Sequence, residues 1–147
     1  MDGIKVEIEL KGPLPPIIGD ASRLRQVIVN MISNARNSLR EKGCAHKLFQ
    51  ITACETKQDD QVFVKIEFLD NGVGIAEQDL DRVFDPFFTT RRENGGTGLG
   101  LSLAFGIVQE YGGTIWLDSR KGEFARFVVQ IPAAGVMQNA ESLTGRR

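Results

Sequence analysis

Apolar residues recur along this chain with the two periods that distinguish strands from helices. Alternation over residues 4–10 predicts a half-buried strand whose apolar positions are Ile4, Val6, Ile8 and Leu10. Apolar-rich runs predict four further strands at residues 48–56, 62–69, 114–118 and 125–131. A polar turn at residues 57–60 joins the first pair of these strands, and residues 121–122 separate the second pair.

Two segments show the three- and four-residue spacing of amphipathic helices. The first is predicted from about residue 21 to residue 42, with Asp20 as its N-cap and Gly43 as its stop. Its apolar stripe consists of Leu24, Val27, Ile28, Met31, Ile32, Ala35 and Leu39. The second helix is predicted over residues 99–111 and ends at two glycines, and the mixed segment 76–94 is predicted to be a short helix followed by a loop.

The order of these elements predicts a sheet covered by helices on one face, an α/β two-layer sandwich. It lacks the strict strand–helix alternation of a doubly wound fold. The length of 147 residues fits one domain, and 41% hydrophobic and 25% charged residues are typical of a globular protein. We expect the domain to occupy residues 1–134, and residues 135–147 to form a frayed, disordered tail.

Charge and cysteine content exclude several classes of function. A formal net charge of -1 lacks the excess of positive charge that is typical of nucleic-acid-binding proteins. Cys44 and Cys54 lie in no metal-binding pattern and are expected to be reduced thiols. No apolar run approaches the length of a membrane span, and the N-terminus lacks a signal core. The chain is therefore expected to be soluble and cytoplasmic, although it could be cut from a larger membrane-bound sensor.

Three asparagines, Asn30, Asn34 and Asn37, lie on one face of the first predicted helix at i, i+4 and i+7. Asparagine is a mediocre helix former, so three on one edge require a reason. One interpretation is a solvated polar face. The other is a row of amide oxygens aimed into a cleft, where a neutral, hard oxygen suits Mg²⁺ beside phosphates.

Residues 70–74 (DNGVG) directly follow an apolar-rich strand. A carboxylate at the end of a strand, here Asp70, can accept a hydrogen bond from an exocyclic amine such as that of adenine. Gly72 and Gly74 would let the backbone pass close to a flat ring. The alternative is an ordinary Asp-Asn-Gly turn.

A glycine-rich run at residues 95–101 (GGTGLGL) opens the second helix. Unpaired N–H groups at a helix start form a cradle for phosphate oxygens, whereas a flexible hinge is the alternative interpretation. The run is neither a P-loop nor a dinucleotide fingerprint. Arg91 and Arg92 precede it and suit multidentate phosphate contact, although a solvated basic turn is equally compatible.

Together these motifs resemble the catalytic, ATP-binding domain of bacterial sensor histidine kinases, a branch of the superfamily that includes gyrase and MutL. Residues 24–35 resemble the N box of that family, 70–74 its first glycine box, 84–88 (FDPFF) its F box and 96–101 its second glycine box. The resemblance covers residues 4–132. Residues 87–91 and 106–110 are most similar to kinases of the nitrogen-regulation type.

The resemblance implies a Bergerat-type ATP-binding fold, with ATP or ADP and Mg²⁺ as ligands. Asn34 would coordinate Mg²⁺, Asp70 would bind the adenine amine, and residues 76–97 would form an ATP lid. Arg91 or Arg92 would contact the γ-phosphate and act with Asn34 in catalysis. The remaining implied nucleotide contacts are Asn30, Asn37, Gly72, Gly74, Ile75, Phe88, Thr89, Gly96, Thr97, Gly98, Leu99, Gly100 and Leu101.

The residue four positions before Asn34 favours phosphoryl transfer over hydrolysis of ATP. Hydrolysing members of the superfamily carry a glutamate base four residues before the Mg²⁺ asparagine, and here that position is Asn30. An amide accepts no proton at neutral pH, so phosphoryl transfer to a positioned side chain is the better fit.

Two positions depart from the pattern of the family. Ala125 replaces a hydroxyl common near the adenine, and the one histidine, His46, lies in a loop without the family's acidic neighbour and is expected on the surface.

The resemblance also implies partners. The phosphoacceptor histidine would lie on a separate dimeric helical hairpin absent from this chain, and a response regulator would act downstream. The domain by itself is expected to be a monomer. Two alternatives remain open at this point: a nucleotide-binding regulatory module without transfer, and a serine kinase of the anti-sigma-factor type.

Overall fold

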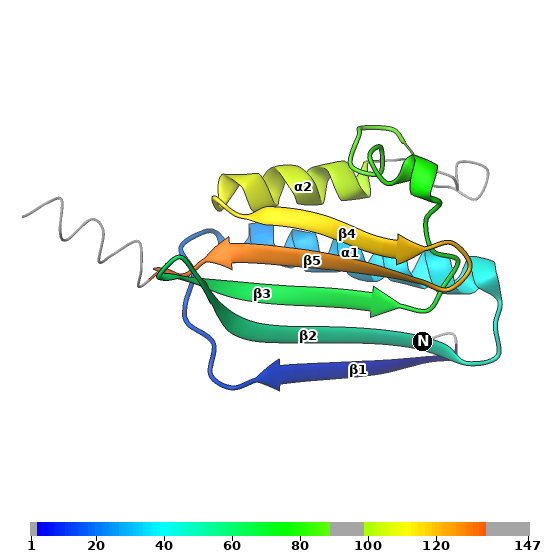
Figure 1. The fold of residues 1–147 in the computed structure, drawn as a ribbon, viewed down its shortest axis with the longest axis horizontal. Helices are drawn as coiled ribbons and strands as arrows, with labels where there is room; N and C mark the ends of the chain where they lie inside the picture. The colour runs from blue at the N-terminus through cyan, green and yellow to red at the C-terminus, as the bar shows by residue number, and fades with distance from the viewer. Residues whose placement is uncertain (1–2, 89–98, 135–147) are drawn as a thin grey trace, which may run out of the picture.

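The structure, a computed structural model, describes residues 3–88 and 99–134. The chain begins with β1 (Ile4–Lys11), α1 (Ala21–Lys42), β2 (Lys47–Gln58) and β3 (Gln61–Asp70). A short 3-10 turn, η1 (Glu77–Asp79), comes before α2 (Gly100–Glu110), β4 (Thr114–Arg120) and β5 (Phe124–Pro132), as Figure 1 shows. The predicted strands and long helices are present, and the short helix predicted in segment 76–94 is the single turn η1.

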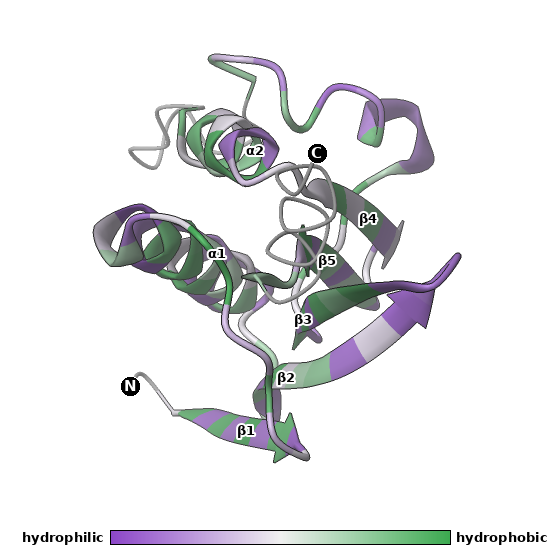
Figure 2. Ribbon diagram, turned by 90° about the vertical axis from the view of Figure 1, so that its left-hand side faces the viewer, coloured by the Kyte–Doolittle hydropathy of each residue, from purple (hydrophilic) through white to green (hydrophobic). Residues whose placement is uncertain are grey.

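The strands form one mixed sheet in the order β1-β2-β3-β5-β4. β1 runs parallel to β2, and every other neighbouring pair is antiparallel. Both long helices lie on the same side of the sheet, which confirms the predicted two-layer α/β sandwich (Figure 2). The core lies between these layers, and its largest fully buried apolar side chains are Phe49, Phe68, Phe127, Met31 and Leu39. None of the helices in the described ranges is long and apolar enough to cross a membrane.

The bounds of α1 follow from local chemistry that the sequence predicted correctly. The Oδ1 atom of Asp20 accepts hydrogen bonds from the backbone N–H (2.8 Å) and the hydroxyl (2.7 Å) of Ser22. These bonds hold the pKa of the Asp20 carboxyl below its ordinary value. At the other end Gly43 adopts a left-handed conformation, with φ of 66°, and its N–H donates to the carbonyl of Leu39.

The hairpin between β2 and β3 is tighter than the sequence indicated. Register pairs Gln58 with Gln61, so only Asp59 and Asp60 form the loop. Both have positive φ, 53° and 65°, as a type I′ turn requires. The right-handed twist of the two strands selects this turn although neither residue is glycine.

The predicted burial of the first strand is wrong. β1 forms, but only Ile4 is buried, whereas Val6, Ile8 and Leu10 are 43%, 67% and 65% exposed. β1 is an edge strand that pairs only with β2, and α1 packs mainly against β2 and β3. Figure 2 shows β1 at the margin of the sheet. Alternation predicted the strand correctly, but the position of the helices decides which strands are covered.

Candidate functional site

Asp70 is the last residue of β3, and its side chain is only 2% exposed. Its Oδ1 atom accepts a hydrogen bond from the backbone N–H of Gly72 (2.9 Å) and one from the hydroxyl of Ser38 on α1 (3.2 Å). The Ser38 hydroxyl in turn accepts from the N–H of Val73 (3.0 Å). These bonds fix the orientation of a buried carboxylate at the junction of the sheet and α1.

Gly72 and Gly74 occupy positions that a larger residue would not fit. A Cβ atom on Gly72 would lie 2.2 Å from the Ser38 hydroxyl and 2.8 Å from Asp70 Oδ1. Gly74 has φ of 68°, and a Cβ there would lie 2.2 Å from the carbonyl oxygen of Arg120. In this turn the backbone therefore lies closer to neighbouring segments than it would in an ordinary loop. Next to it, the N–H of Ile75 donates to the hydroxyl of Ser119 (2.8 Å).

The asparagine edge of α1 leads from this turn toward α2. Asn30, Asn34 and Ser38 are spaced four residues apart and span about 12 Å along the helix axis. At one end Ser38 contacts Asp70, and at the other the side chain of Asn30 donates to the carbonyl of Gly100, the first residue of α2. The third predicted residue, Asn37, is exposed.

Asn30 and Asn34 differ in their contacts, although both are half-buried. The Asn30 amide is engaged at both ends, because Gln26 also donates to its Oδ1 atom (2.8 Å). The Asn34 side chain makes no hydrogen bond with any residue in the described ranges. Its amide oxygen is therefore the better placed of the two to take an external ligand, and a neutral oxygen fits Mg²⁺ that is also held by phosphates and water.

The first turn of α2 offers backbone N–H donors and contains no acidic residue. Leu99 is its N-cap and offers no side-chain cap, and no acidic residue lies in the first turn. Gly100 and Leu101 open the helix, so the positive end of its dipole and its first N–H groups lie at these two residues. Such a helix start attracts an anion.

The F box is divided between core and surface. The ring of Phe84 packs on Phe105 of α2 and on Phe127 of β5, with centroids 5.3 Å and 6.1 Å away. Phe88 lies under the guanidinium of Arg82, 4.7 Å from its ring centroid. Phe87 has φ of 68° and is 59% exposed. Phe84 thus fixes residues 84–88 to the core.

Six of the predicted site residues lie outside the described ranges: Thr89, Arg91, Arg92, Gly96, Thr97 and Gly98. Among the described ones, the fold brings Asn30 and Asn34 onto one edge of α1, between the Asp70 turn and the start of α2. Sequence analysis missed Ser38. Its signal was available, because Ser38 continues the four-residue series of Asn30 and Asn34.

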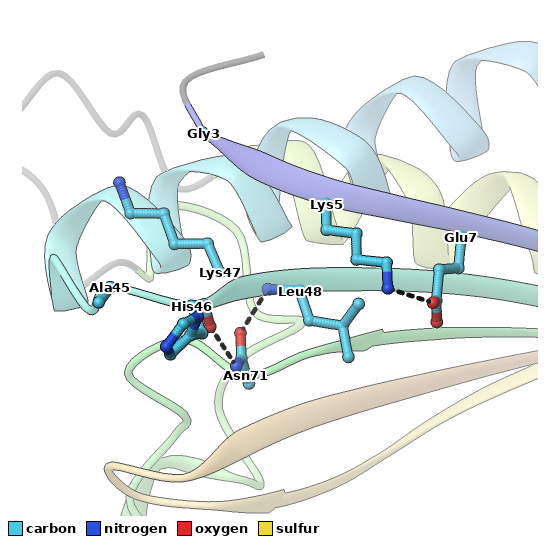
Figure 3. Close-up of a pocket in the computed structure, with 8 residues that line it drawn as sticks. All are labelled: Gly3, Lys5, Glu7, Ala45, His46, Lys47, Leu48 and Asn71. Carbon is cyan, nitrogen blue, oxygen red and sulfur yellow. Dashed lines mark hydrogen bonds and ion pairs between the residues drawn. The ribbon is translucent and has the colours of Figure 1, made fainter.

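A separate cavity of about 340 Å³ lies at the ends of β1 and β2, and Figure 3 shows its lining. Asn71 lines this cavity. Its amide donates to the carbonyl of His46 (2.8 Å) and accepts from the N–H of Leu48 (2.8 Å). Lys5 and Glu7 form an ion pair beside it (3.2 Å). None of the predicted nucleotide contacts lines this cavity, and His46 is exposed there, as the sequence predicted.

Comparison with known proteins agrees with this arrangement. The family described as histidine kinase-, DNA gyrase B-, and HSP90-like ATPase (HATPase_c) matches residues 19–135. The chain belongs to this family. Two-component sensor PprA of Pseudomonas aeruginosa is 37% identical over 132 residues, 88% of this chain and 14% of that protein. Sensor histidine kinase ZraS of Escherichia coli K12 is 37% identical over 129 residues, 88% of this chain and 26% of that protein.

The solved structures that resemble this chain are also histidine kinases. The nucleotide-free catalytic domain of histidine kinase ThkA superposes with a TM-score of 0.71 at 30% identity, over 89% of this chain and 81% of that one. Full-length ShkA in complex with AMPPNP gives a TM-score of 0.71 at 26% identity, over 90% of this chain and 26% of that one. Fold and sequence are those of the catalytic ATP-binding domain of two-component sensor histidine kinases. The chain spans 14% to 26% of the two sensor proteins above.

Proposed function

We propose that this chain binds Mg²⁺-ATP and presents the γ-phosphate for transfer to a histidine on a separate helical-hairpin module. The observation that carries the proposal is the α1 edge, which connects the buried Asp70 carboxylate to the start of α2 through Ser38, Asn34 and Asn30. Support also comes from the ShkA structure, because that protein was solved with the ATP analogue AMPPNP.

At the base end of the site, Asp70 accepts a hydrogen bond from the exocyclic amine of adenine. Its Oδ1 atom already faces Gly72 and Ser38, so the carboxylate has a fixed orientation before the nucleotide arrives. Gly72, Gly74 and Ile75 form the wall beside the ring. Pre-organisation of this kind supports binding because little side-chain entropy is lost when the base enters.

At the phosphate end, Asn34 would hold Mg²⁺ through its amide oxygen, a neutral, hard ligand that suits this ion. Bound Mg²⁺ supplies charge neutralisation to the phosphates. The backbone at Leu99, Gly100 and Leu101 binds phosphate oxygens, and Phe88 and the exposed Asn37 lie at the margin of the site. Thr89, Gly96, Thr97 and Gly98 complete the phosphate cradle, and Arg91 or Arg92 contacts the γ-phosphate, within a lid of residues 76–97.

In the reaction a nitrogen of the acceptor imidazole forms a bond to the γ-phosphorus. The bond from that phosphorus to the bridging oxygen breaks, and the electron pair leaves with ADP. Asn30 stands where a hydrolase of the superfamily has its glutamate, so the described part of the site holds no carboxylate base to activate water there. Positioning and charge stabilisation suffice for transfer.

We further propose that the domain comprises residues 1–134 and lies in the cytoplasm, that its kinase is of the nitrogen-regulation type, and that it passes the phosphoryl group to a response regulator. Support for the type comes from the sequence at residues 87–91 and 106–110. Sensor names among the relatives support the two-component assignment. The isolated chain is expected to be a monomer.

The test mixes the chain with γ-labelled ATP, Mg²⁺ and a hairpin domain of the same kinase. Label on the hairpin histidine supports the proposal. Asp70→Ala should reduce labelling at least about 10-fold, the value of one charge-assisted hydrogen bond. Asn34→Ala should also reduce labelling, through the loss of a metal ligand. Glu55→Ala on β2 and Ser33→Ala on α1, both exposed, are the matched controls. Tight Mg²⁺-ATP binding without transfer would indicate a regulatory module, and label on a serine would indicate a serine kinase. Normal ATP binding by Asp70→Ala would refute the pocket.

A further inference from the structure

Asn30 uses both ends of its amide within the protein. Its Nδ2 atom donates to the carbonyl of Gly100 (3.0 Å), and its Oδ1 atom accepts from Nε2 of Gln26 (2.8 Å), one turn earlier on α1. The first bond joins residues 70 positions apart, and the side chain is half-buried. Gln26 therefore orients the Asn30 amide so that its NH₂ group points at the first residue of α2.

The far end of α2 is attached to α1 by different residues. Arg23 of α1 forms an ion pair with Glu110, and the Tyr111 hydroxyl donates to the backbone carbonyl of Asp20. Gly19 permits this contact, since a Cβ there would overlap the Tyr111 ring. Arg23 and Tyr111 thus join the C-terminal end of α2 to α1. At the N-terminal end, the Asn30 side chain joins Gly100, the first residue of α2, to α1.

We propose that Asn30 is a positioning residue that fixes the N-terminal turn of α2 relative to α1, one helical turn from Asn34. The proposal rests on the proposed function, because it concerns the same site. The amide holds the Gly100 carbonyl, and the N–H groups of the first α2 turn are thereby held at a constant distance from the metal ligand. Asn30 acts on phosphate binding through the backbone of α2 instead of by contact with the metal.

This role differs measurably from that of a metal ligand. Loss of Asn34 weakens only the Mg²⁺-dependent part of ATP binding. Loss of Asn30 displaces donors that bind phosphate oxygens directly, so ATP binding weakens to the same extent with and without Mg²⁺. Adenosine lacks phosphates, and its affinity does not depend on α2.

The experiment titrates the chain and its Asn30→Ala, Asn34→Ala and Ser33→Ala variants with ATP in Mg²⁺, with ATP in EDTA, and with adenosine. Asn30→Ala should lose about 10-fold in ATP affinity under both conditions, the equivalent of one hydrogen bond, with adenosine unchanged. Asn34→Ala should lose affinity only in Mg²⁺, and the exposed Ser33→Ala control should bind normally. Gln26→Leu should show a smaller loss in the same direction as Asn30→Ala.

Amide hydrogen exchange in the nucleotide-free chain provides the second readout. Asn30→Ala should speed exchange at Leu103, which donates to Leu99 in the first turn of α2, while exchange at Val108 stays unchanged. A loss confined to Mg²⁺, an equal loss for adenosine, or unchanged exchange at Leu103 would overturn the positioning role. If the unaltered chain binds no ATP, the proposed function fails, and the exchange data still decide whether Asn30 fixes α2.

Discussion

Replacement of Gly72 by alanine tests whether the Asp70 turn is a close-packed junction. The new Cβ would lie 2.2 Å from the Ser38 hydroxyl, 2.7 Å from the Ser38 carbonyl carbon and 2.8 Å from Asp70 Oδ1. Rotation of the Ser38 side chain cannot relieve the clash, because one of these atoms belongs to the backbone of α1. The turn must therefore move away from α1. The hydrogen bonds from Gly72 to Asp70, from Ser38 to Asp70 and from Val73 to Ser38 must lengthen as it does so.

The expected cost follows from those bonds. Three hydrogen bonds of 2.9, 3.2 and 3.0 Å hold the junction, and each contributes about 1 kcal/mol net. Gly72→Ala should therefore lower the free energy of unfolding by about 2–3 kcal/mol. For a chain of this size the melting temperature should fall by roughly 4–12 °C. Nucleotide affinity should fall as well, because the Asp70 carboxylate loses its fixed orientation.

Urea denaturation followed by circular dichroism measures the first effect, and calorimetric titration with ATP measures the second. Gly106→Ala is the matched control: it lies within α2 with open space around it, and helix propensity predicts a gain of about 1 kcal/mol. If Gly72→Ala unfolds within about 0.5 kcal/mol of the unaltered chain and binds ATP equally well, the turn is not packed as described.

Three further substitutions test other parts of the fold. Asp20→Ala removes the α1 cap and should lower the urea midpoint at pH 7. Because Ser22 lowers the folded-state pKa of Asp20, the stability from this cap should be present above the unfolded-state pKa and be lost as pH falls through the folded value. Asp20→Asn should flatten that acid dependence, and an unchanged profile would contradict it. Asp60→Gly should raise the unfolding free energy by roughly 0.5–1 kcal/mol in the same urea assay, since glycine adopts positive φ without strain; a decrease would argue against the type I′ turn. Phe84→Ala should cost about 3 kcal/mol through loss of its packing on Phe105, and a cost below about 1 kcal/mol would show that the F box is not anchored in the core.

The local elements could be predicted because each is governed by neighbouring residues. The Asp20 cap, the Gly43 stop and the apolar stripe between them determine α1, and its observed bounds match the prediction. Alternation likewise identified β1. Its burial could not be predicted, because whether Ile8 is covered depends on where α1 docks on the sheet, and that position is determined by residues distant in sequence.

The candidate site likewise separates what the sequence predicted from what the tertiary structure decided. Sequence by itself predicted that Asp70, Asn30 and Asn34 bind a nucleotide, because residue type and spacing determine which groups share a strand end or a helix edge. Only the tertiary structure assigned them different contacts. It joined Ser38 to Asp70 and Asn30 to Gly100, bonds between residues 32 and 70 positions apart, and left the Asn34 amide without a partner in the described ranges. Side-chain periodicity is a local property of the backbone, whereas the partner of each polar group is decided by the packing of the whole chain.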